Sequence, residues 1–142
     1  MRAAIFVVLL MAGCADRGLR PFSSDGCSLF PDKAPIGDAD WCACCLAHDR
    51  AYWRGGTEEQ RRAADAALKA CVLKATGDEA LAEAMRAGVR VGGTPALPTP
   101  FRWGYGWPYD RGYRPLTPKE EVMAQRQFRP GVAGSTCERS KP

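Results

Sequence analysis

The sequence predicts one small, mainly α-helical domain that is held together by disulfides. Capping residues and paired glycines divide residues 40–93 into three segments of helical character, and no segment alternates apolar and polar residues over a convincing strand length. Six cysteines besides Cys14 are enough for three disulfides in an oxidising compartment. A chain of 142 residues leaves room for little more than one domain.

The first predicted helix follows a long loop. Residues 15–39 are rich in proline, glycine, aspartate and serine and have no sustained period, which is typical of a loop. Asp40 suits the N-cap of a helix, and the glycine pair at 55–56 ends that helix.

Two further helices are predicted from their capping residues. Residues 57–60, Thr-Glu-Glu-Gln, form a capping-box pattern that opens a second helix. This helix is rich in alanine and runs to about Ala75, with Gly77 as its stop. Asp78 could cap a third helix, which ends before the glycine pair at 92–93.

The C-terminal part of the chain is predicted to be irregular and aromatic. Six prolines fall within residues 95–118, so regular structure is not expected there, and residues 118–128 are predicted to form one short helix. Six of the chain's 13 aromatic residues lie within residues 101–113. This run could form a small core, or it could lie at a membrane interface, where Trp and Tyr are favoured.

The N-terminus predicts export. Residues 3–11 are uniformly apolar but too few for a permanent membrane helix, which needs about 20, so residues 1–13 are interpreted as a signal peptide. Residues 10–14, Leu-Met-Ala-Gly-Cys, resemble the bacterial lipobox, in which the cysteine receives the lipid. Lipidation of Cys14 would anchor a domain of residues 14–142 in the cell envelope and would remove the odd seventh cysteine. The alternative is ordinary cleavage near Gly13 and a secreted protein.

The distribution of charged residues indicates which kinds of partner the protein could bind. The net charge is +4, and residues 77–142 hold ten Lys and Arg against seven Asp and Glu. A weakly basic C-terminal half suits an anionic membrane surface. Because the chain has no dense basic stripe, nucleic acid is not an expected partner, and the sequence points to no particular protein partner.

The only histidine, His48, lies where two helices could place a carboxylate beside it. Cys44 precedes His48 by one helical turn, and Asp65 precedes Cys71 by six residues. If the two helices are antiparallel and Cys44 bridges to Cys71, His48 lies about 6 Å and Asp65 about 9 Å along the shared axis from the bridge. The imidazole and the carboxylate could therefore meet, and such a carboxylate would orient a general base.

Residues 44–52, Cys-Cys-Leu-Ala-His-Asp-Arg-Ala-Tyr, resemble the C-C-x-x-H-D-x-x-Y signature of secreted phospholipases A2. Asp65 to Cys71 resembles the D-x-x-x-x-x-C pattern of the second long helix in that family. The resemblance covers residues 25–75 best and implies the family's disulfide-linked antiparallel helix pair. Residues from Gly92 onward resemble nothing in that family.

The resemblance implies a role for each matched residue. His48 would deprotonate a water that attacks a phospholipid acyl ester, Asp65 would orient His48, and Tyr52 would hydrogen-bond Asp65. Asp49 would bind a calcium ion, which polarises the ester carbonyl. By the same analogy Cys27 pairs with Cys45 and Cys44 with Cys71, which leaves Cys42 for Cys137.

The segment that should complete the calcium site departs from the family pattern. The family's loop is rich in glycine, whereas residues 25–32 contain one glycine. Because Ca²⁺ takes 6–8 oxygen ligands, backbone carbonyls near Cys27 and Leu29 and water would have to complete the set. The Gly-Tyr-Gly of residues 104–106 is a less favoured substitute.

Other readings of these residues lead to different chemistry. Cys42, Cys44, Cys45 and His48 could bind zinc by residue type, but their spacing is compressed for a four-ligand site. The pair at 61–62, Arg-Arg, is interpreted as a solvated helix face. The sequence thus favours a calcium-dependent phospholipase A2-like hydrolase acting at a phospholipid membrane surface. The alternative is a catalytically silent lipid- or partner-binding lipoprotein on the same scaffold.

Overall fold

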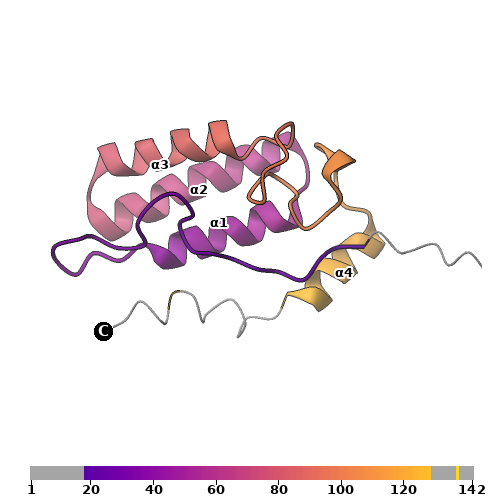
Figure 1. The fold of residues 1–142 in the computed structure, drawn as a ribbon, viewed down its shortest axis with the longest axis horizontal. Coiled ribbons are helices and arrows are strands. Elements are labelled where there is room, and N and C mark those ends of the chain that lie inside the picture. The colour runs from indigo at the N-terminus through magenta and orange to yellow at the C-terminus, as the bar shows by residue number, and fades with distance from the viewer. Residues whose placement is uncertain (1–17, 129–136, 138–142) are drawn as a thin grey trace, which may run out of the picture.

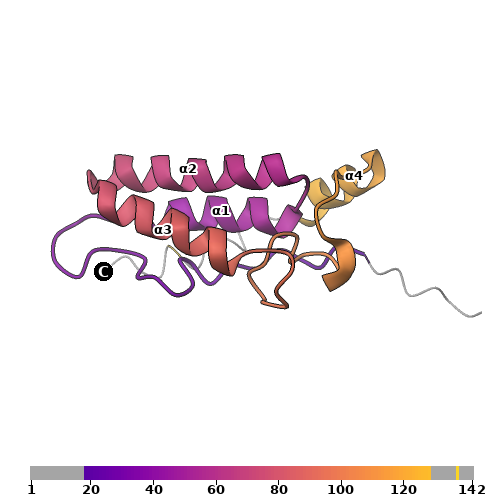
Figure 2. The ribbon, with the colours of Figure 1, turned by 90° about the horizontal axis from the view of Figure 1, so that it is seen from above.

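Three long helices form the body of the fold in the computed structural model, which describes residues 18–128 and Cys137. The helices are α1 (Cys42–Arg54), α2 (Glu58–Thr76) and α3 (Glu79–Gly92), followed by a 3-10 turn, η1 (Tyr109–Arg111), and by α4 (Pro118–Gln127). Figures 1 and 2 show α2 running back along α1, with α3 beside α2. The described residues contain no strand, which confirms the predicted mainly helical class.

The helix ends follow the predicted capping residues, with one displacement. The Thr57 side chain accepts a hydrogen bond from the Gln60 backbone in a capping box, and Asp78 caps α3. The first helix is capped by Trp41, one residue later than predicted. Asp40 instead pairs with Lys33 in an isolated bridge, and its carboxylate accepts from the Cys42 N–H. The extended backbone of the bridge delays the start of the helix.

Three disulfides join these elements. They are Cys27–Cys45, Cys44–Cys71 and Cys42–Cys137, so all three expected pairings are confirmed. The bridge from Cys44 to Cys71 fixes α1 against α2, and the bridge from Cys27 to Cys45 fixes the N-terminal loop against α1. Because these cysteines are oxidised, they are not thiolate ligands, and the alternative of a zinc site at residues 42–48 is ruled out.

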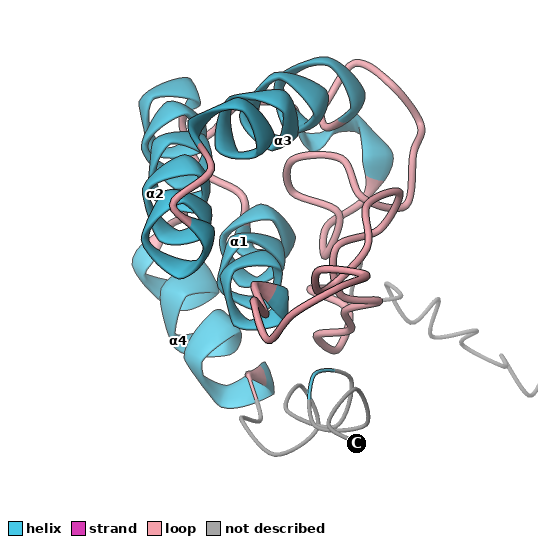
Figure 3. Ribbon diagram, turned by 90° about the vertical axis from the view of Figure 1, so that its left-hand side faces the viewer, coloured by secondary structure: helices cyan, strands magenta, loops and turns pink. Residues whose placement is uncertain are grey.

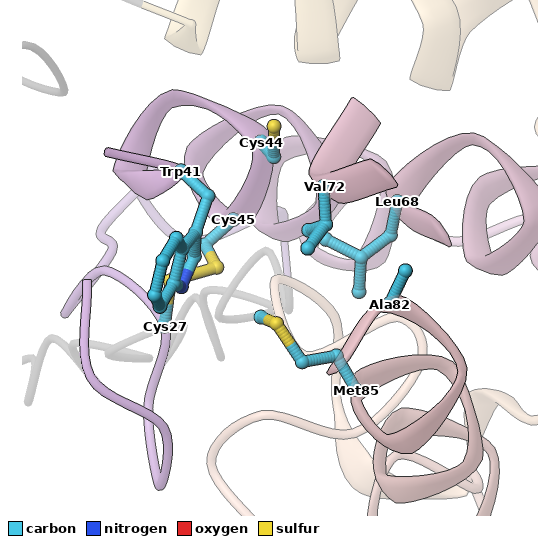
Figure 4. Close-up of a cluster of buried hydrophobic side chains, with 8 residues drawn as sticks. All are labelled: Cys27, Trp41, Cys44, Cys45, Leu68, Val72, Ala82 and Met85. Carbon is cyan, nitrogen blue, oxygen red and sulfur yellow. A yellow bond between two sulfur atoms is a disulfide. The ribbon is translucent and has the colours of Figure 1, made fainter. Parts of the chain in front are cut away.

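The main core lies between α1, α2 and α3. Figure 4 shows Leu68 and Val72 of α2 facing Ala82 and Met85 of α3, with the Cys27–Cys45 disulfide beside them. A second cluster of buried side chains lies at the C-terminal end of α1 and reaches α4, and it consists of Leu19, Phe22, Trp53, Trp107 and Ala124. In Figure 3 the loops lie together on one side of the helices.

The aromatic segment of residues 101–113 covers the C-terminal end of α1, whose C-cap residue is Gly55. Carbonyl groups in the last turn of a helix lack partners within the helix. Here the backbone N–H of Gly104 donates to the Tyr52 carbonyl at 2.6 Å, and the N–H of Gly106 donates to the Trp53 carbonyl at 3.1 Å. The Trp107 indole donates to the Arg54 carbonyl at 2.7 Å. The segment is therefore irregular, as predicted, but firmly docked.

Two predicted features of the N-terminus, the signal peptide of residues 1–13 and lipidation at Cys14, lie outside the described residues. No helix within residues 18–128 combines the length and the apolar character that a membrane span requires.

Replacement of Gly106 by alanine should test the docking of the aromatic segment. A Cβ atom there would lie 2.5 Å from Leu19 and 2.6 Å from the Trp53 ring, both of them buried side chains. We expect Gly106→Ala to lower the free energy of unfolding by about 1–3 kcal/mol, which is typical of overpacking. Gly92→Ala is the control, because its Cβ would meet Phe101 at an ordinary 3.5 Å. Equal denaturation curves for the two variants would contradict the docking.

Candidate active site

The imidazole of His48 and the carboxylate of Asp65 meet between α1 and α2. His48 Nε2 lies 2.9 Å from Asp65 Oδ1, and both side chains are buried. The Tyr52 hydroxyl, one turn after His48, donates to the same carboxylate oxygen at 2.7 Å. The meeting that helical spacing predicted is therefore confirmed, and the three matched residues lie together.

The second oxygen of Asp65 is bound by a cation. Arg90 Nη1 donates to Asp65 Oδ2 at 2.9 Å, and Arg61 Nε lies 4.0 Å from the same atom. Burial alone would raise the pKa of Asp65, but the hydrogen bonds from His48, Arg90 and Tyr52 outweigh it and lower the pKa below the usual value. Asp65 is therefore an ionised carboxylate at neutral pH, although its side chain is only 1% exposed.

An ionised Asp65 decides which nitrogen of His48 carries the proton. A carboxylate can only accept hydrogen bonds, so the Nε2 atom that faces it must be the donor in the neutral imidazole. The other ring nitrogen, Nδ1, then has the free lone pair that a general base requires. Because His48 lines an adjacent cavity, this base is accessible from the cavity.

The prediction that Arg61 lies on a solvated face is wrong. Arg61 is 2% exposed, and its guanidinium donates to the hydroxyls of Tyr52 and Tyr113 and to the carbonyls of Val89 and Arg90. The neighbouring Arg62 is exposed, as expected. Arg61 precedes Asp65 by four residues and so shares its helix face, which is the signal that could have identified it.

Asp49 lies in a different electrostatic environment from Asp65. The pKa of Asp49 is raised to about 7, chiefly by burial and also by the nearby charges of Asp25 and Asp32, against a hydrogen bond from Ser24 that lowers it. The Ser24 hydroxyl donates to Asp49 Oδ2 at 2.6 Å. A half-buried carboxylate with two acidic neighbours, and with no cation among its hydrogen-bond partners in the described residues, is costly to ionise. A bound cation would remove that cost.

The residues around Asp49 suit a cation that prefers oxygen. A cavity beside Asp49 is also lined by polar side chains that carry oxygen donors only, namely Ser23, Ser24, Asp25 and Tyr105. Calcium prefers oxygen ligands. The described residues contain no group of three His, Cys, Asp or Glu side chains placed to bind a metal ion, so hydroxyl, carbonyl and water oxygens would have to complete the set.

The loop of residues 25–32, which was predicted to complete the calcium site, lies beside Asp49. Residues 26–29 line the same cavity as His48 and Asp49. Gly26 has a φ of 87°, and Ser28 has a φ of 51°, so the backbone turns sharply at both residues. The Cys27 carbonyl accepts the Phe30 N–H at 3.0 Å and retains one lone pair. The sequence did not identify Ser24 or Asp25 as ligands. Both lie beside Asp49 in the structure, although they are far from it in the sequence. The Gly-Tyr-Gly of residues 104–106, weighed as a substitute loop, is occupied in capping α1.

A largely apolar cavity opens beside the base. Its volume is about 120 Å³, several times the space that one water needs, which is roughly 10–15 Å³. His48, Asp49 and Tyr52 lie at its polar side. Its other walls are mainly apolar, and include Leu29, Phe30, Leu68, Met85, Val89 and Phe101. This combination of a few polar groups with apolar walls is typical of a site for a small apolar ligand or chain.

The chain matches no known protein-family model, no curated protein and no solved structure. What the site can do therefore follows from its geometry and its residue types. Those residues form an oriented imidazole, an adjacent carboxylate among oxygen donors, and an apolar cavity that reaches both. In such a set the imidazole can take a proton from a water molecule, which then attacks an electrophile whose apolar substituent lies in the cavity.

The raised pKa of Asp49 has a measurable consequence for stability. Its folded pKa of about 7 exceeds the usual 3.8, so the folded protein holds an extra proton between these values and loses stability as the pH rises from 4 to 7. We expect Asp49→Asn to remove this loss and, in the presence of a calcium chelator at pH 8, to raise the free energy of unfolding by about 1–3 kcal/mol. Urea denaturation across this pH range measures both effects.

The exposed Asp38 supplies the control for this comparison. Asp38→Asn should leave the pH dependence of the wild type in place. A wild-type protein whose stability is constant from pH 4 to 7, or an Asp49→Asn variant that is less stable than wild type in chelator, would contradict the assignment.

Proposed function

We propose that this protein is a calcium-dependent phospholipase A2-like hydrolase of phospholipid acyl esters. The observation that carries the proposal is the hydrogen bond of 2.9 Å between His48 Nε2 and Asp65 Oδ1 at the edge of an apolar cavity. The antiparallel pair of α1 and α2, bridged from Cys44 to Cys71, agrees with the arrangement that the motif resemblance implies. Motif, bridge and hydrogen bond are three separate features that favour the same chemistry.

The proposed reaction uses His48 as a general base. His48 Nδ1 takes a proton from a water, whose oxygen attacks the carbonyl carbon of the ester. The imidazolium that forms is stabilised by Asp65, as a buried carboxylate stabilises the histidine of other hydrolases. The imidazolium then returns the proton to the leaving alkoxide, so that the ester C–O bond breaks and a fatty acid and a lysophospholipid are released.

The calcium ion of the proposed enzyme would be held by Asp49, with hydroxyl and backbone oxygens of residues 23–29. When bound, it would polarise the ester carbonyl and neutralise the oxyanion. The desolvated Asp49 supports this role, because a nearby cation would favour the ionised form of its carboxylate.

The substrate class is inferred from the shape and charge of the site. The apolar cavity suits an acyl chain, and its wall residue Leu29 is 89% exposed, so this side chain is accessible to a membrane surface. The weakly basic C-terminal half would favour an anionic phospholipid surface. A phospholipid membrane surface is thus the proposed partner, with no nucleic acid.

A second candidate function is a catalytically silent module that binds lipid or a partner protein. The observation in its favour is that the described residues contain no group of three or more His, Cys, Asp or Glu side chains that could hold a metal ion. A silent module, however, would have no need for a histidine that is oriented by a buried carboxylate. We therefore place the enzyme first.

We also propose that the protein is exported and anchored in the bacterial cell envelope through a lipid on Cys14, or is secreted if ordinary signal peptidase cleaves it. The three disulfides are in keeping with an oxidising compartment. Anchoring would hold the hydrolase at the surface that carries its substrate.

The proposed chemistry predicts that substitutions of His48 and of Asp49 have different effects on hydrolysis and on calcium binding. His48→Gln should lower the rate of hydrolysis of phospholipid vesicles by about 100- to 10 000-fold, because an amide cannot accept and return the proton. It should still bind Ca²⁺. Asp49→Asn should lose both hydrolysis and Ca²⁺ binding, because it removes the carboxylate assigned to the ion. Fatty-acid release and calorimetric Ca²⁺ titration measure the two properties.

The wild-type protein with its disulfides formed is the reference for both variants. If it neither binds calcium nor releases fatty acid from vesicles, the enzyme fails as a proposal. Vesicle binding without hydrolysis would then favour the silent lipid-binding module.

Lipidation predicts a change of location for a single substitution. Cys14→Ser should move the protein from the membrane fraction to the soluble envelope fraction, because the only proposed anchor is lost. Cell fractionation with an antibody to the protein measures the change. Membrane association that is the same in the variant and the wild type would refute lipidation at Cys14.

A further inference from the structure

Arg61 joins four parts of the fold at the candidate active site. Its Nε donates to the Tyr52 hydroxyl at 2.9 Å, and its Nη1 donates to the Tyr113 hydroxyl at 2.6 Å. Its Nη2 donates to the Val89 and Arg90 carbonyls at 3.0 and 2.7 Å. A guanidinium has five N–H groups and no acceptor, so nearly all of its capacity is used by α1, by the C-terminal end of α3 and by the aromatic segment.

Arg61 acts on Asp65 through the hydroxyl group of Tyr52. Because arginine cannot accept, the Tyr52 oxygen must accept the proton of Arg61 Nε. The single proton of Tyr52 is then free to point to Asp65 Oδ1 at 2.7 Å, a shorter contact than the alternative at 3.3 Å to the Val89 carbonyl. Arg61 thus fixes the orientation of the tyrosine hydroxyl.

Arg90 acts on the other carboxylate oxygen. Its Nη1 donates to Asp65 Oδ2 at 2.9 Å, while His48 and Tyr52 share Oδ1. A carboxylate held at both oxygens cannot rotate about its bond to the side chain without breaking one set of contacts. Asp65 consequently presents Oδ1 to His48 in one geometry.

We propose that Arg61 and Arg90 are positioning residues, which act through Tyr52 and Asp65 to keep the proton of His48 on Nε2 and the lone pair on Nδ1. The proposal rests on the proposed function, since it concerns the base of that reaction. A buried arginine is expensive, and an apolar residue of similar volume would often stabilise a fold as well or better. Both arginines pair with the one carboxylate that orients the imidazole. This role in positioning the base is a chemical reason for placing arginine here despite the free-energy cost of burial.

The first experiment compares each arginine with a matched arginine on its own helix. Arg61→Gln and Arg90→Gln should lower kcat on phospholipid vesicles by about 10- to 100-fold with little change in KM, because a misoriented base slows the reaction without altering substrate binding. Arg62→Gln and Arg86→Gln are the controls, since Arg62 pairs with Glu58 and Arg86 with Glu83 at the surface. Both controls should retain wild-type kcat. Arg90→Lys should recover part of the loss, because an ammonium can still donate to Asp65.

A double-mutant cycle distinguishes the two routes. Arg61 is proposed to act through the Tyr52 hydroxyl, so in a Tyr52→Phe background Arg61→Gln should change kcat by less than about threefold. Arg90 contacts Asp65 directly, so Arg90→Gln should keep most of its effect in the same background. An Arg61 effect of equal size in both backgrounds would overturn the proposed route.

A spectroscopic measurement tests the positioning without any substrate. The chain has one histidine, so ¹⁵N-histidine labelling gives signals from a single imidazole. The wild type should show a proton on Nε2 that is protected from exchange with water. In Arg61→Gln and Arg90→Gln this proton should exchange at least about tenfold faster, whereas in Arg62→Gln and Arg86→Gln it should not.

The outcomes separate this inference from the proposed function. Unchanged kcat and unchanged imidazole signals in folded Arg61→Gln and Arg90→Gln would overturn the inference, and so would a rise in KM alone. If Arg61→Gln does not fold, Arg90→Gln and Arg90→Lys decide the question, since Arg90 is the more exposed of the two. If the wild type releases no fatty acid, the proposed function fails, and the imidazole signals still decide whether the arginines position His48.

Discussion

The fold has to keep one carboxylate, that of Asp65, ionised in its core. Asp65 lies between three helices, where an isolated negative charge would be very costly. Its oxygens are met by His48 and Tyr52 from α1 and by Arg90 from α3, with Arg61 of α2 behind them. Each long helix thus supplies a partner to the same group, and the relative positions of α1, α2 and α3 are fixed by it as well as by the apolar core.

The irregular C-terminal segment is docked against the same part of the fold. Tyr52 and Trp53 stand in the last turn of α1, and the backbone of residues 104–106 satisfies their carbonyls. Tyr113 reaches Arg61 from the same segment. The indole rings of Trp103 and Trp107 are buried and therefore belong to the core. For these two residues this favours the interpretation of the aromatic run as a small core over that of a membrane interface. Tyr109 remains partly exposed and available to a membrane interface.

The sequence predicts what depends on local rules. Helix ends set by Thr57 and Asp78 follow from side chains that bond the neighbouring backbone, and the meeting of His48 with Asp65 follows from helical spacing and a bridge. The four-residue spacing of Arg61 from Asp65 places both on one helix face, but the spacing alone does not show that the end of α3 covers Arg61. Ser24 was missed for the same reason, since its contact with Asp49 spans 25 residues of chain through a loop without periodicity.

Asp49 and Asp65 show how one small core gives two carboxylates different chemistry. Both are withdrawn from water, which by itself raises the pKa of a carboxylic acid. Asp65 is surrounded by donors and two guanidinium groups, and its pKa falls below the usual value. Asp49 has acidic neighbours and a single hydroxyl donor, and its pKa rises to about 7. Titratable groups whose environments separate their pKa values in this way commonly divide the tasks of a catalytic site. Here the charge of Asp65 is balanced within the protein, so it can hold His48 permanently. The charge of Asp49 is not balanced within the described residues, which supports the proposal that a cation binds there.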